Sequence, residues 1–508
     1  MKRIVRCRKL LELSPEKARE FFLEKGNYCS LKLPPYFRFN RILGRAGRIL
    51  EGRPLPEFYK IGVSPVDFEN VNLTFLMSKD GRFSWRPMQI IHPVIYLSLV
   101  NRLTEPKNWV LIQKFFSAEA RLKIIRPVGQ ILAAARERSG AAAAIMNWRQ
   151  KIEQESLMLS LDYRVMAETD IELYYESIRF GDLKREFLNS GIRGMGLLGE
   201  EIMTSLQAGL QGTTQGLPQG SVVMDFLAEM LLLGVDLRLE ARLRQENLLD
   251  KIKILRFRDD YRIFAEDIPT AEGVVGLISE ALAEFSLHLS TKKTRFYNDV
   301  IAVARKEDKA YWDERRATVF LDRNGEPREM SLQKQLFRIY ELAREFPNSG
   351  SVCRALMDLF EKRILKLEEK PRDNLQLIAI VAKIFLENPR AGMVAAGILS
   401  RLLDFEKLAG RRQLLEKLAG QVRKLSHNEY LEICLQRLTI LELPELPFSG
   451  KLARFMAGED VRLWNSDWLD AEFNEESVIN HRALTRLSPV MTAEEVRVFE
   501  NYEMFTGI

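Results

Sequence analysis

Residues 251–265 read KIKILRFRDDYRIFA. Two short runs rich in β-branched and aromatic residues, 251–257 and 261–265, flank Arg258, Asp259 and Asp260, and this order predicts a β-hairpin with two acids at its tip. Neighbouring carboxylates repel each other unless a cation lies between them. The tip is therefore a candidate cation site, although an ordinary polar turn would contain the same two residues.

A third acid, Asp170, follows a predicted strand from Tyr163 to Thr169. Phosphoryl transfer from a nucleoside triphosphate needs two divalent cations about 3.5–4 Å apart. Carboxylates at strand ends and hairpin tips suit a hard cation such as Mg²⁺, which takes few protein ligands. If the fold brings Asp170 to the tip formed by Asp259 and Asp260, the three carboxylates could share two Mg²⁺ ions.

The composition is that of a globular protein. The chain has 508 residues, too many for one hydrophobic core, so we expect two or three domains. It contains 46% hydrophobic and 29% charged residues, which excludes a disordered chain. No apolar stretch reaches about 18 residues and no signal peptide is recognisable, so we expect a cytoplasmic protein without a membrane span. The four cysteines lack Cys-x-x-Cys spacing, which argues against a zinc site.

Basic residues concentrate near the N-terminus. The whole chain has a formal net charge of only +6, but residues 1–50 contain 13 Lys or Arg and 4 Glu. Two interpretations stay open for this segment: a surface that contacts nucleic-acid phosphates, and a solvated basic face.

Three regions differ in their sequence pattern. Residues 1–150 are mixed, residues 151–325 alternate strand-like and helical runs, and residues 326–508 repeat apolar residues at three- and four-residue spacing. We expect an α+β N-terminal part followed by an all-α C-terminal domain.

Local signals predict individual helices. One covers 94–103, and a long one covers 222–244 with Ser221 as its N-cap. The Ala-rich stretch 130–150 predicts two helical pieces.

Two segments of the C-terminal region share a Pro-x-x-Gly pattern. They are Pro347-Asn348-Ser349-Gly350 and Pro389-Arg390-Ala391-Gly392, 42 residues apart, and each precedes a predicted helix. This period falls in the range of HEAT-like helical hairpins. With two copies, a HEAT-like repeat and a non-repetitive helical bundle both remain open.

Five motifs between about residues 75 and 300 follow one another in an order that resembles the reverse-transcriptase superfamily. They are the fingers segment KDGRFSWRP (79–87), the first palm motif around Asp170 to Tyr175, GLPQGS (216–221), FRDD (257–260) and LHLSTKKT (287–294). The resemblance implies a right-hand polymerase, with an N-terminal segment and fingers over 1–150 and a palm over 151–325, before the helical domain of 326–508.

The resemblance also implies roles for matching residues. Asp170, Asp259 and Asp260 would be catalytic and, with Ile171, would bind two Mg²⁺ ions, for which Mn²⁺ could substitute. Lys79 and Arg86 would hold the triphosphate, since a guanidinium fork suits phosphate oxygens. Residues lining the nucleotide site would further include Tyr175, which would exclude a 2′-hydroxyl, together with Gln219, Gly220, Phe257 and Lys293. Individually, the charged residues among them would also suit solvated surface positions, and Tyr175 a core.

Within the superfamily, the chain resembles the abortive-infection and related defence-associated reverse transcriptases of bacteria, which have a C-terminal helical-repeat domain. LPPYF (33–37) and RPMQIIHP (86–93) agree with that group. The group implies a closed homo-oligomer, a trimer or hexamer, in the bacterial cytoplasm. Its members make single-stranded DNA from dNTPs, some without a template, some on a structured non-coding RNA, and some from a protein tyrosine. Tyr36 is a candidate priming residue, although a packed tyrosine is the simpler interpretation.

The function that follows is an RNA-directed or template-independent DNA polymerase in antiphage defence. Two alternatives remain: a catalytically silent nucleic-acid-binding scaffold and a retroelement polymerase of retron or intron type. If the helical region forms a solenoid, basic side chains at Arg411, Arg412, Lys417 and Arg423 could guide the product strand, or they could lie on an ordinary exposed helix face.

Overall fold

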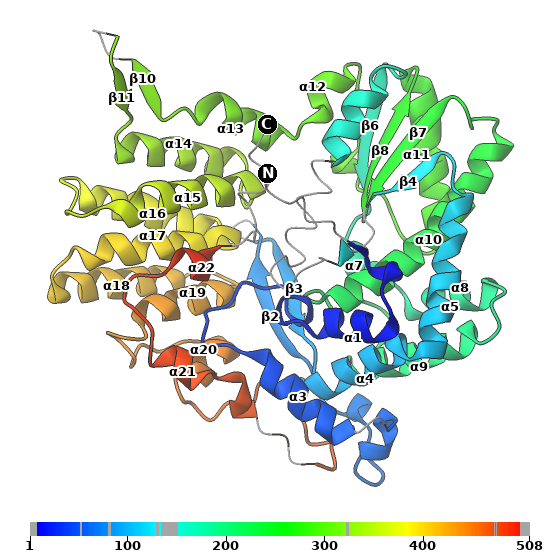
Figure 1. The fold of residues 1–508 in the computed structure, drawn as a ribbon, viewed down its shortest axis with the longest axis horizontal. Coiled ribbons are helices and arrows are strands. Elements are labelled where there is room, and N and C mark those ends of the chain that lie inside the picture. Colours follow the sequence, from blue (N-terminus) through cyan, green and yellow to red (C-terminus); the bar gives the residue numbers. More distant parts are fainter. Residues whose placement is uncertain are drawn as a thin grey trace.

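The computed structural model describes residues 8–50, 53–79, 83–128, 132–133, 151–321, 325–471, 473 and 475–497. Figure 1 shows a sheet with its helices at the upper right, a stack of helices at the left, and a two-stranded hairpin between them. Among the described residues, no helix has both the length and the apolar character that crossing a bilayer requires.

A five-stranded sheet forms the centre of the right-hand part, in the order β4-β7-β8-β6-β9. β4 pairs in parallel with β7, and the other pairs are antiparallel. The strands are β4 (Ile125–Pro127), β6 (Val165–Asp170), β7 (Ile252–Phe257), β8 (Asp260–Ala265) and β9 (Arg295–Tyr297). The predicted hairpin of residues 251–265 is confirmed by β7 and β8.

The period of two along these strands divides their side chains between two cores. Ile254 and Ile263 point into the main core. Leu255 and Phe264 point to the opposite side of the sheet, into a smaller cluster with Val300. The sheet is therefore covered on both faces, which explains why apolar side chains occur on both faces of its strands.

Helices pack on this sheet and on one another. They are α7 (Tyr174–Ser177), α8 (Phe180–Asn189), α9 (Met195–Gly209), α10 (Val222–Gln245) and α11 (Ile268–Ala283). The predicted helix of 222–244 is confirmed by α10. Ser221 stands at its N-cap, but its side chain makes no capping bond, and the hydroxyl is buried without a partner.

The N-terminal part supports the hairpin that links the two sides of the molecule. The hairpin consists of β2 (Leu73–Ser78) and β3 (Trp85–Ile90). Around it lie α1 (Pro15–Leu23), α2 (Lys25–Tyr28), α3 (Phe39–Leu50), α4 (Pro93–Thr104) and α5 (Pro106–Phe116). The helix predicted over 94–103 is confirmed by α4.

The prediction of helical pieces over 130–150 is wrong at its start. Leu132–Ala133 form the short strand β5, which pairs with β1 (Arg8–Lys9). A backbone pairing partner more than 120 positions away overrides the helix propensity of alanine there. Residues 129–131 and 134–150 lie outside the described residues.

Six helices form the left-hand stack. They are α14 (Leu332–Glu345), α15 (Gly350–Lys362), α16 (Asn374–Glu387), α17 (Gly392–Asp404), α18 (Leu408–Val422) and α19 (Glu429–Thr439). Gly350 and Gly392 each begin a helix, as the Pro-x-x-Gly segments predict. Before the stack come α12 (Val300–Ala304), α13 (Glu307–Arg315) and the hairpin of β10 (Val319–Leu321) and β11 (Pro327–Glu329).

The segment after α19 packs against the N-terminal part of the chain. It contains α20 (Lys451–Met456), η8 (Glu475–Val478), α21 (His481–Leu484) and α22 (Ala493–Val496). The indole of Trp464 donates to the carbonyl of Ile90 (2.9 Å), and the backbone of Asn480 donates to that of Tyr36 (2.8 Å). Figure 1 shows this segment running alongside α3.

Candidate active site

Asp170, Asp259 and Asp260 meet at one end of the central sheet. Asp170 is the last residue of β6 and lies directly opposite Asp260, the first residue of β8. Asp259 occupies the turn between β7 and β8, and its carbonyl accepts a bond from the amide of Ile171 (3.1 Å). The three acids, distant in the sequence, are therefore brought together by the strand register.

Burial and a neighbouring carboxylate disfavour the charged forms of Asp170 and Asp259. Burial raises the pKa of Asp170, with Lys293 acting against the shift and Asp260 adding to it. Burial and the neighbouring Asp260 raise the pKa of Asp259 to about 6. One carboxylate oxygen of Asp170, Oδ1, is buried and has no hydrogen-bond partner among the described residues. Such a set of hard oxygen donors under mutual repulsion fits a divalent cation.

Lys293 donates to the other carboxylate oxygen of Asp170. It lies in η5 (Thr291–Lys293), which is placed by a bond from the amide of Ser290 to the carbonyl of Asp170 (2.8 Å). Burial alone would lower the pKa of Lys293, but the bond to Asp170 raises it overall. The three aspartates, one of them paired with Lys293, are adjacent in the strand register but do not form a preassembled metal-binding group, and among the described residues no other group of three or more His, Cys, Asp and Glu forms one.

A buried ion cluster lies beneath the turn. Arg256 on β7 is 1% exposed and pairs with Asp236 (2.7 Å) and Glu229 (3.1 Å), both on α10. The same guanidinium donates to the carbonyl of Arg258 in the turn (3.1 Å). Arg256 therefore connects the helix after the GLPQGS motif to the backbone that carries Asp259.

A second polar chain reaches the turn from the side. The hydroxyl of Tyr175 donates to Asp225 on α10 (2.6 Å), and Arg258 donates to the other oxygen of Asp225 (2.7 Å). Arg258 has a φ of 53°, in the left-handed region that costs a non-glycine residue about 1–2 kcal/mol. Its ion pair with Asp225 helps hold this conformation. Asp225 was not among the predicted site residues, because its only signal in the sequence is an acid within an apolar run.

The backbone carbonyls of Gln219 and Gly220 accept hydrogen bonds from other parts of the protein backbone. The carbonyl of Gln219 accepts from the amide of Gln89 on β3, and that of Gly220 accepts from Ser30, both at 2.8 Å. Gly220 has a φ of 133°, and a Cβ there would lie 2.7 Å from the carbonyl oxygen of Gln89. Glycine at this position thus allows the GLPQGS segment to approach the β2–β3 hairpin.

The predicted triphosphate ligands lie at the end of that hairpin. Arg86 pairs across it with Met77, and the amide of Lys79 donates to the carbonyl of Ser84 (2.7 Å). Burial and the nearby charge of Arg86 lower the pKa of Lys79, whereas the negative charge of Asp170 acts in the opposite direction. Phe257 is buried at the end of β7, 6.0 Å from the guanidinium of Arg258.

Two other predictions disagree with the structure. Tyr36 is fully buried, its hydroxyl has no described partner, and burial raises its pKa, so it cannot be reached as a primer in this conformation. Arg411 pairs with Glu442 and Asp404, and Arg412 pairs with Glu445, so these two cations are already neutralised.

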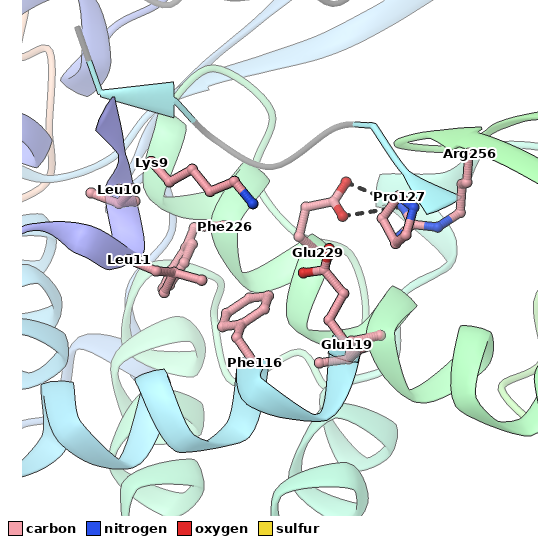
Figure 2. Close-up of a pocket in the computed structure, with 10 residues that line it drawn as sticks. Lys9, Leu10, Leu11, Phe116, Glu119, Pro127, Phe226, Glu229 and Arg256 are labelled. Atoms are coloured by element: carbon pink, nitrogen blue, oxygen red, sulfur yellow. Dashed lines mark hydrogen bonds and ion pairs between the residues drawn. The ribbon is translucent and has the colours of Figure 1, made fainter. Parts of the chain in front are cut away.

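A pocket lies beside the buried ion cluster of Arg256, behind the candidate active site. Figure 2 shows Glu229 and Arg256 at its inner wall, with Leu10, Phe116 and Phe226 contributing apolar surface. The side chain of Lys9 extends over it toward Glu229. This pocket does not contain the three aspartates, so it is separate from the candidate active site.

The sheet, its covering helices and the carboxylates at the hairpin define the palm of a nucleic-acid polymerase. The family model of the reverse transcriptase (RNA-dependent DNA polymerase) matches residues 70–325, about half of the chain. The chain therefore belongs to the reverse-transcriptase family, and residues 70–325 form a nucleotidyltransferase domain.

Solved structures with some likeness to the chain are yeast telomerases. Apo telomerase from Candida tropicalis, truncated from its C-terminal domain, is 13% identical with a TM-score of 0.33, covering 44% of this chain and 49% of its own. Another structure of apo telomerase from that species is 11% identical with a TM-score of 0.31, and the match covers 76% of this chain and 67% of the telomerase chain. Telomerase from Candida albicans with a fragment of telomeric RNA is 8% identical with a TM-score of 0.31, and the match covers 83% of this chain and 68% of the telomerase chain. The chain spans about half of the first structure. No curated protein matches the sequence.

Proposed function

We propose that this protein is a DNA polymerase that adds dNTPs to a growing strand, either copying RNA or without a template. The observation that carries the proposal is the register of β6 and β8, which places Asp170 opposite Asp260 with Asp259 in the adjoining turn. The raised pKa values of Asp170 and Asp259 are those expected of carboxylates arranged to receive a cation.

Two Mg²⁺ ions, or Mn²⁺ in their place, would be held by the three aspartates and the carbonyl of Ile171. When bound, such ions lower the pKa of the attacking hydroxyl and stabilise the charge of the leaving pyrophosphate. The unpartnered oxygen of Asp170 supports this assignment, because a buried acceptor without a donor is costly unless a ligand occupies it.

The remaining side chains would bind the nucleotide and move protons. Lys79 and Arg86 would hold the triphosphate, and the lowered pKa of Lys79 agrees with a cation in a crowded positive site. Lys293, released from Asp170, would donate a proton to the leaving pyrophosphate. Tyr175, whose hydroxyl is fixed by Asp225, would present its ring to the sugar and disfavour ribonucleotides.

The template or product strand would run along α3. This helix buries Phe39 and Ile42 on one face and carries Arg41, Arg45 and Arg48 on the other. Among the described residues, none of these arginines has an ion-pair partner, and the helix contains no acid. Unpaired arginines at helical spacing suit a phosphate backbone, so the basic N-terminal segment gains a specific interpretation.

The biological setting is proposed from the resemblance to abortive-infection reverse transcriptases. It comprises antiphage defence in a bacterial cytoplasm, a HEAT-like architecture for α14 to α19, and a trimer or hexamer. Phage challenge of cells expressing the wild type or Asp260→Asn tests the defence role. Light scattering after size-exclusion chromatography tests the oligomer.

Nucleotide incorporation tests the enzymatic proposal. Purified protein is incubated with each dNTP and Mg²⁺, with and without an RNA template, and compared with Asp260→Asn and with Asp250→Asn. Both residues are exposed acids of the same hairpin, but Asp250 lies at the end away from the turn. We expect the first variant to lose synthesis and the second to keep it. Full activity of Asp260→Asn, or an inactive wild type under every condition, would favour the scaffold alternative.

A further inference from the structure

We propose that Asn348, in the helical stack, is a positioning residue for nucleotide binding because it fixes the end of the β2–β3 hairpin. This inference rests on the proposed function, which places Lys79 in the nucleotide site. The side-chain amide of Asn348 donates to the carbonyl of Lys79, 269 residues away in the sequence.

Asn348 uses its other polar groups to join the two Pro-x-x-Gly segments. Its backbone amide donates to the side chain of Asn388 (2.8 Å), and its side-chain oxygen accepts from the amide of Arg390 (2.9 Å). The guanidinium of Arg390 also donates to the carbonyl of Asn348 (3.3 Å). The two segments that share the Pro-x-x-Gly pattern therefore contact each other at neighbouring turns of the stack.

The backbone at Asn348 explains why asparagine suits this position. Its φ is 56°, in the left-handed region that Asn tolerates better than most residues. Its side chain has one acceptor and one donor side, so it can bind both the stack and the hairpin. With both sides engaged, the orientation of the amide toward Lys79 is fixed by the helical stack.

A second contact on the same hairpin supports this role. The carbonyl of His427, just before α19, accepts from the amide of Ser78 (3.1 Å), and Asn428 forms an isolated β-bridge with Met77. The ring of Trp85 lies 5.5 Å from that of His427. The helical stack thus holds both strands of the hairpin, next to the residues proposed to bind the triphosphate.

Losing the contact between Asn348 and Lys79 should weaken nucleotide binding more than it slows nucleotide incorporation. Asn348 contacts the backbone of Lys79 and none of the three aspartates. Releasing this contact leaves the aspartates in register but lets the cation of Lys79 move. A side chain that positions a binding group without touching the reacting atoms affects KM more than kcat.

The sharpest variant is Asn348→Asp. A carboxylate keeps the acceptor for Arg390 but replaces the donor that faces Lys79 with a second acceptor. The matched control is Asn374→Asp in α16, which removes a donor to the carbonyl of Leu402 and to the carboxylate of Glu406 inside the stack, away from the hairpin, and so perturbs the stack at least as strongly. Both proteins are compared with the full-length wild type by steady-state dNTP incorporation and by hydrogen–deuterium exchange of residues 73–79 and 83–90.

We expect Asn348→Asp to raise the KM for dNTP by about five- to tenfold, with kcat changed less than about twofold. Exchange in the hairpin should become faster in Asn348→Asp and stay unchanged in Asn374→Asp. Unchanged KM and exchange in Asn348→Asp, or an equal KM increase in the control, would overturn the inference. An inactive wild type would instead refute the proposed function, and the exchange comparison would still decide whether Asn348 holds the hairpin.

Discussion

Replacing Arg256 with methionine should destabilise the palm severely, because it leaves two buried carboxylates without their cation. The side chains of Arg256 and Asp236 are 1% and 0% exposed, and that of Glu229 is 9% exposed. Removing one partner from a buried ion pair costs about 3–5 kcal/mol, since the remaining charge has no solvent to stabilise it. We expect the free energy of unfolding of the sheet that contains β7 and β8 to fall by an amount in this range.

A matched control separates burial from simple loss of charge. Arg242 lies on α10 as well, but its side chain is 33% exposed, and it pairs with the exposed Glu280 and Glu284. Surface pairs of this kind contribute about 0.2–1 kcal/mol. Arg242→Met should therefore cost at least about threefold less than Arg256→Met.

The stability that Arg256→Met loses should also depend on pH in a defined direction. Burial already raises the pKa of Glu229 and of Asp236 in the wild type, despite Arg256. Without Arg256, both pKa values rise further. A carboxyl whose pKa is raised in the folded state keeps its proton there at a pH where the unfolded chain has lost it. Folding stability therefore falls as pH increases, and the deficit should be smaller at pH 5 than at pH 8.

Urea unfolding followed by hydrogen exchange within residues 252–265 reports on this sheet without requiring the whole chain to unfold in one step. Adding Glu229→Gln and Asp236→Asn to Arg256→Met should recover part of the loss, because neutral amides need no counter-ion. A loss no larger than that of Arg242→Met, or one that grows as the pH falls, would refute the reasoning.

Three further predictions concern the active site and the strand path. Burial and the neighbouring Asp260 raise the pKa of Asp259 to about 6, so this carboxyl takes up a proton below that pH. The affinity of the protein for Mg²⁺ should therefore fall between pH 7 and pH 5, and a constant affinity would contradict this. Replacing Arg41 and Arg45 with glutamine should reduce the log–log salt slope of single-strand binding by about 1.4 between about 50 and 200 mM salt, whereas Arg462→Gln, which loses an already paired cation, should leave it unchanged. Tyr175→Ala should admit ribonucleotides and Tyr175→Phe should not; equal discrimination by both variants would exclude a role for the ring.

Local sequence rules predicted the elements that depend on near neighbours. Alternating apolar residues around Asp259 and Asp260 gave the β7–β8 hairpin, and the apolar run after Ser221 gave α10. Gly350 and Gly392 marked the first residues of two helices. Each of these features is decided within about ten residues of chain, where spacing and turn chemistry operate.

Contacts between distant segments could not be predicted in this way. Nothing near Tyr36 indicates that the C-terminal segment covers it, and nothing near Asn348 indicates a partner at Lys79. Arg411 and Arg412 read as free cations until the fold supplies their acids. The buried cluster of Arg256 was hidden for the same reason, since its carboxylates are scattered among the apolar residues of α10 and nothing nearby in the sequence shows that they meet an arginine of β7.

The return of the C-terminal segment to the N-terminal part affects how the protein is made. The bond between Trp464 and the carbonyl of Ile90 spans 374 residues. At about 5–20 residues per second, the ribosome delivers Trp464 roughly 20–75 seconds after Ile90. During this interval the apolar surface around β3 lacks its final cover, which makes a nascent chain stalled before residue 464 a natural client for chaperones.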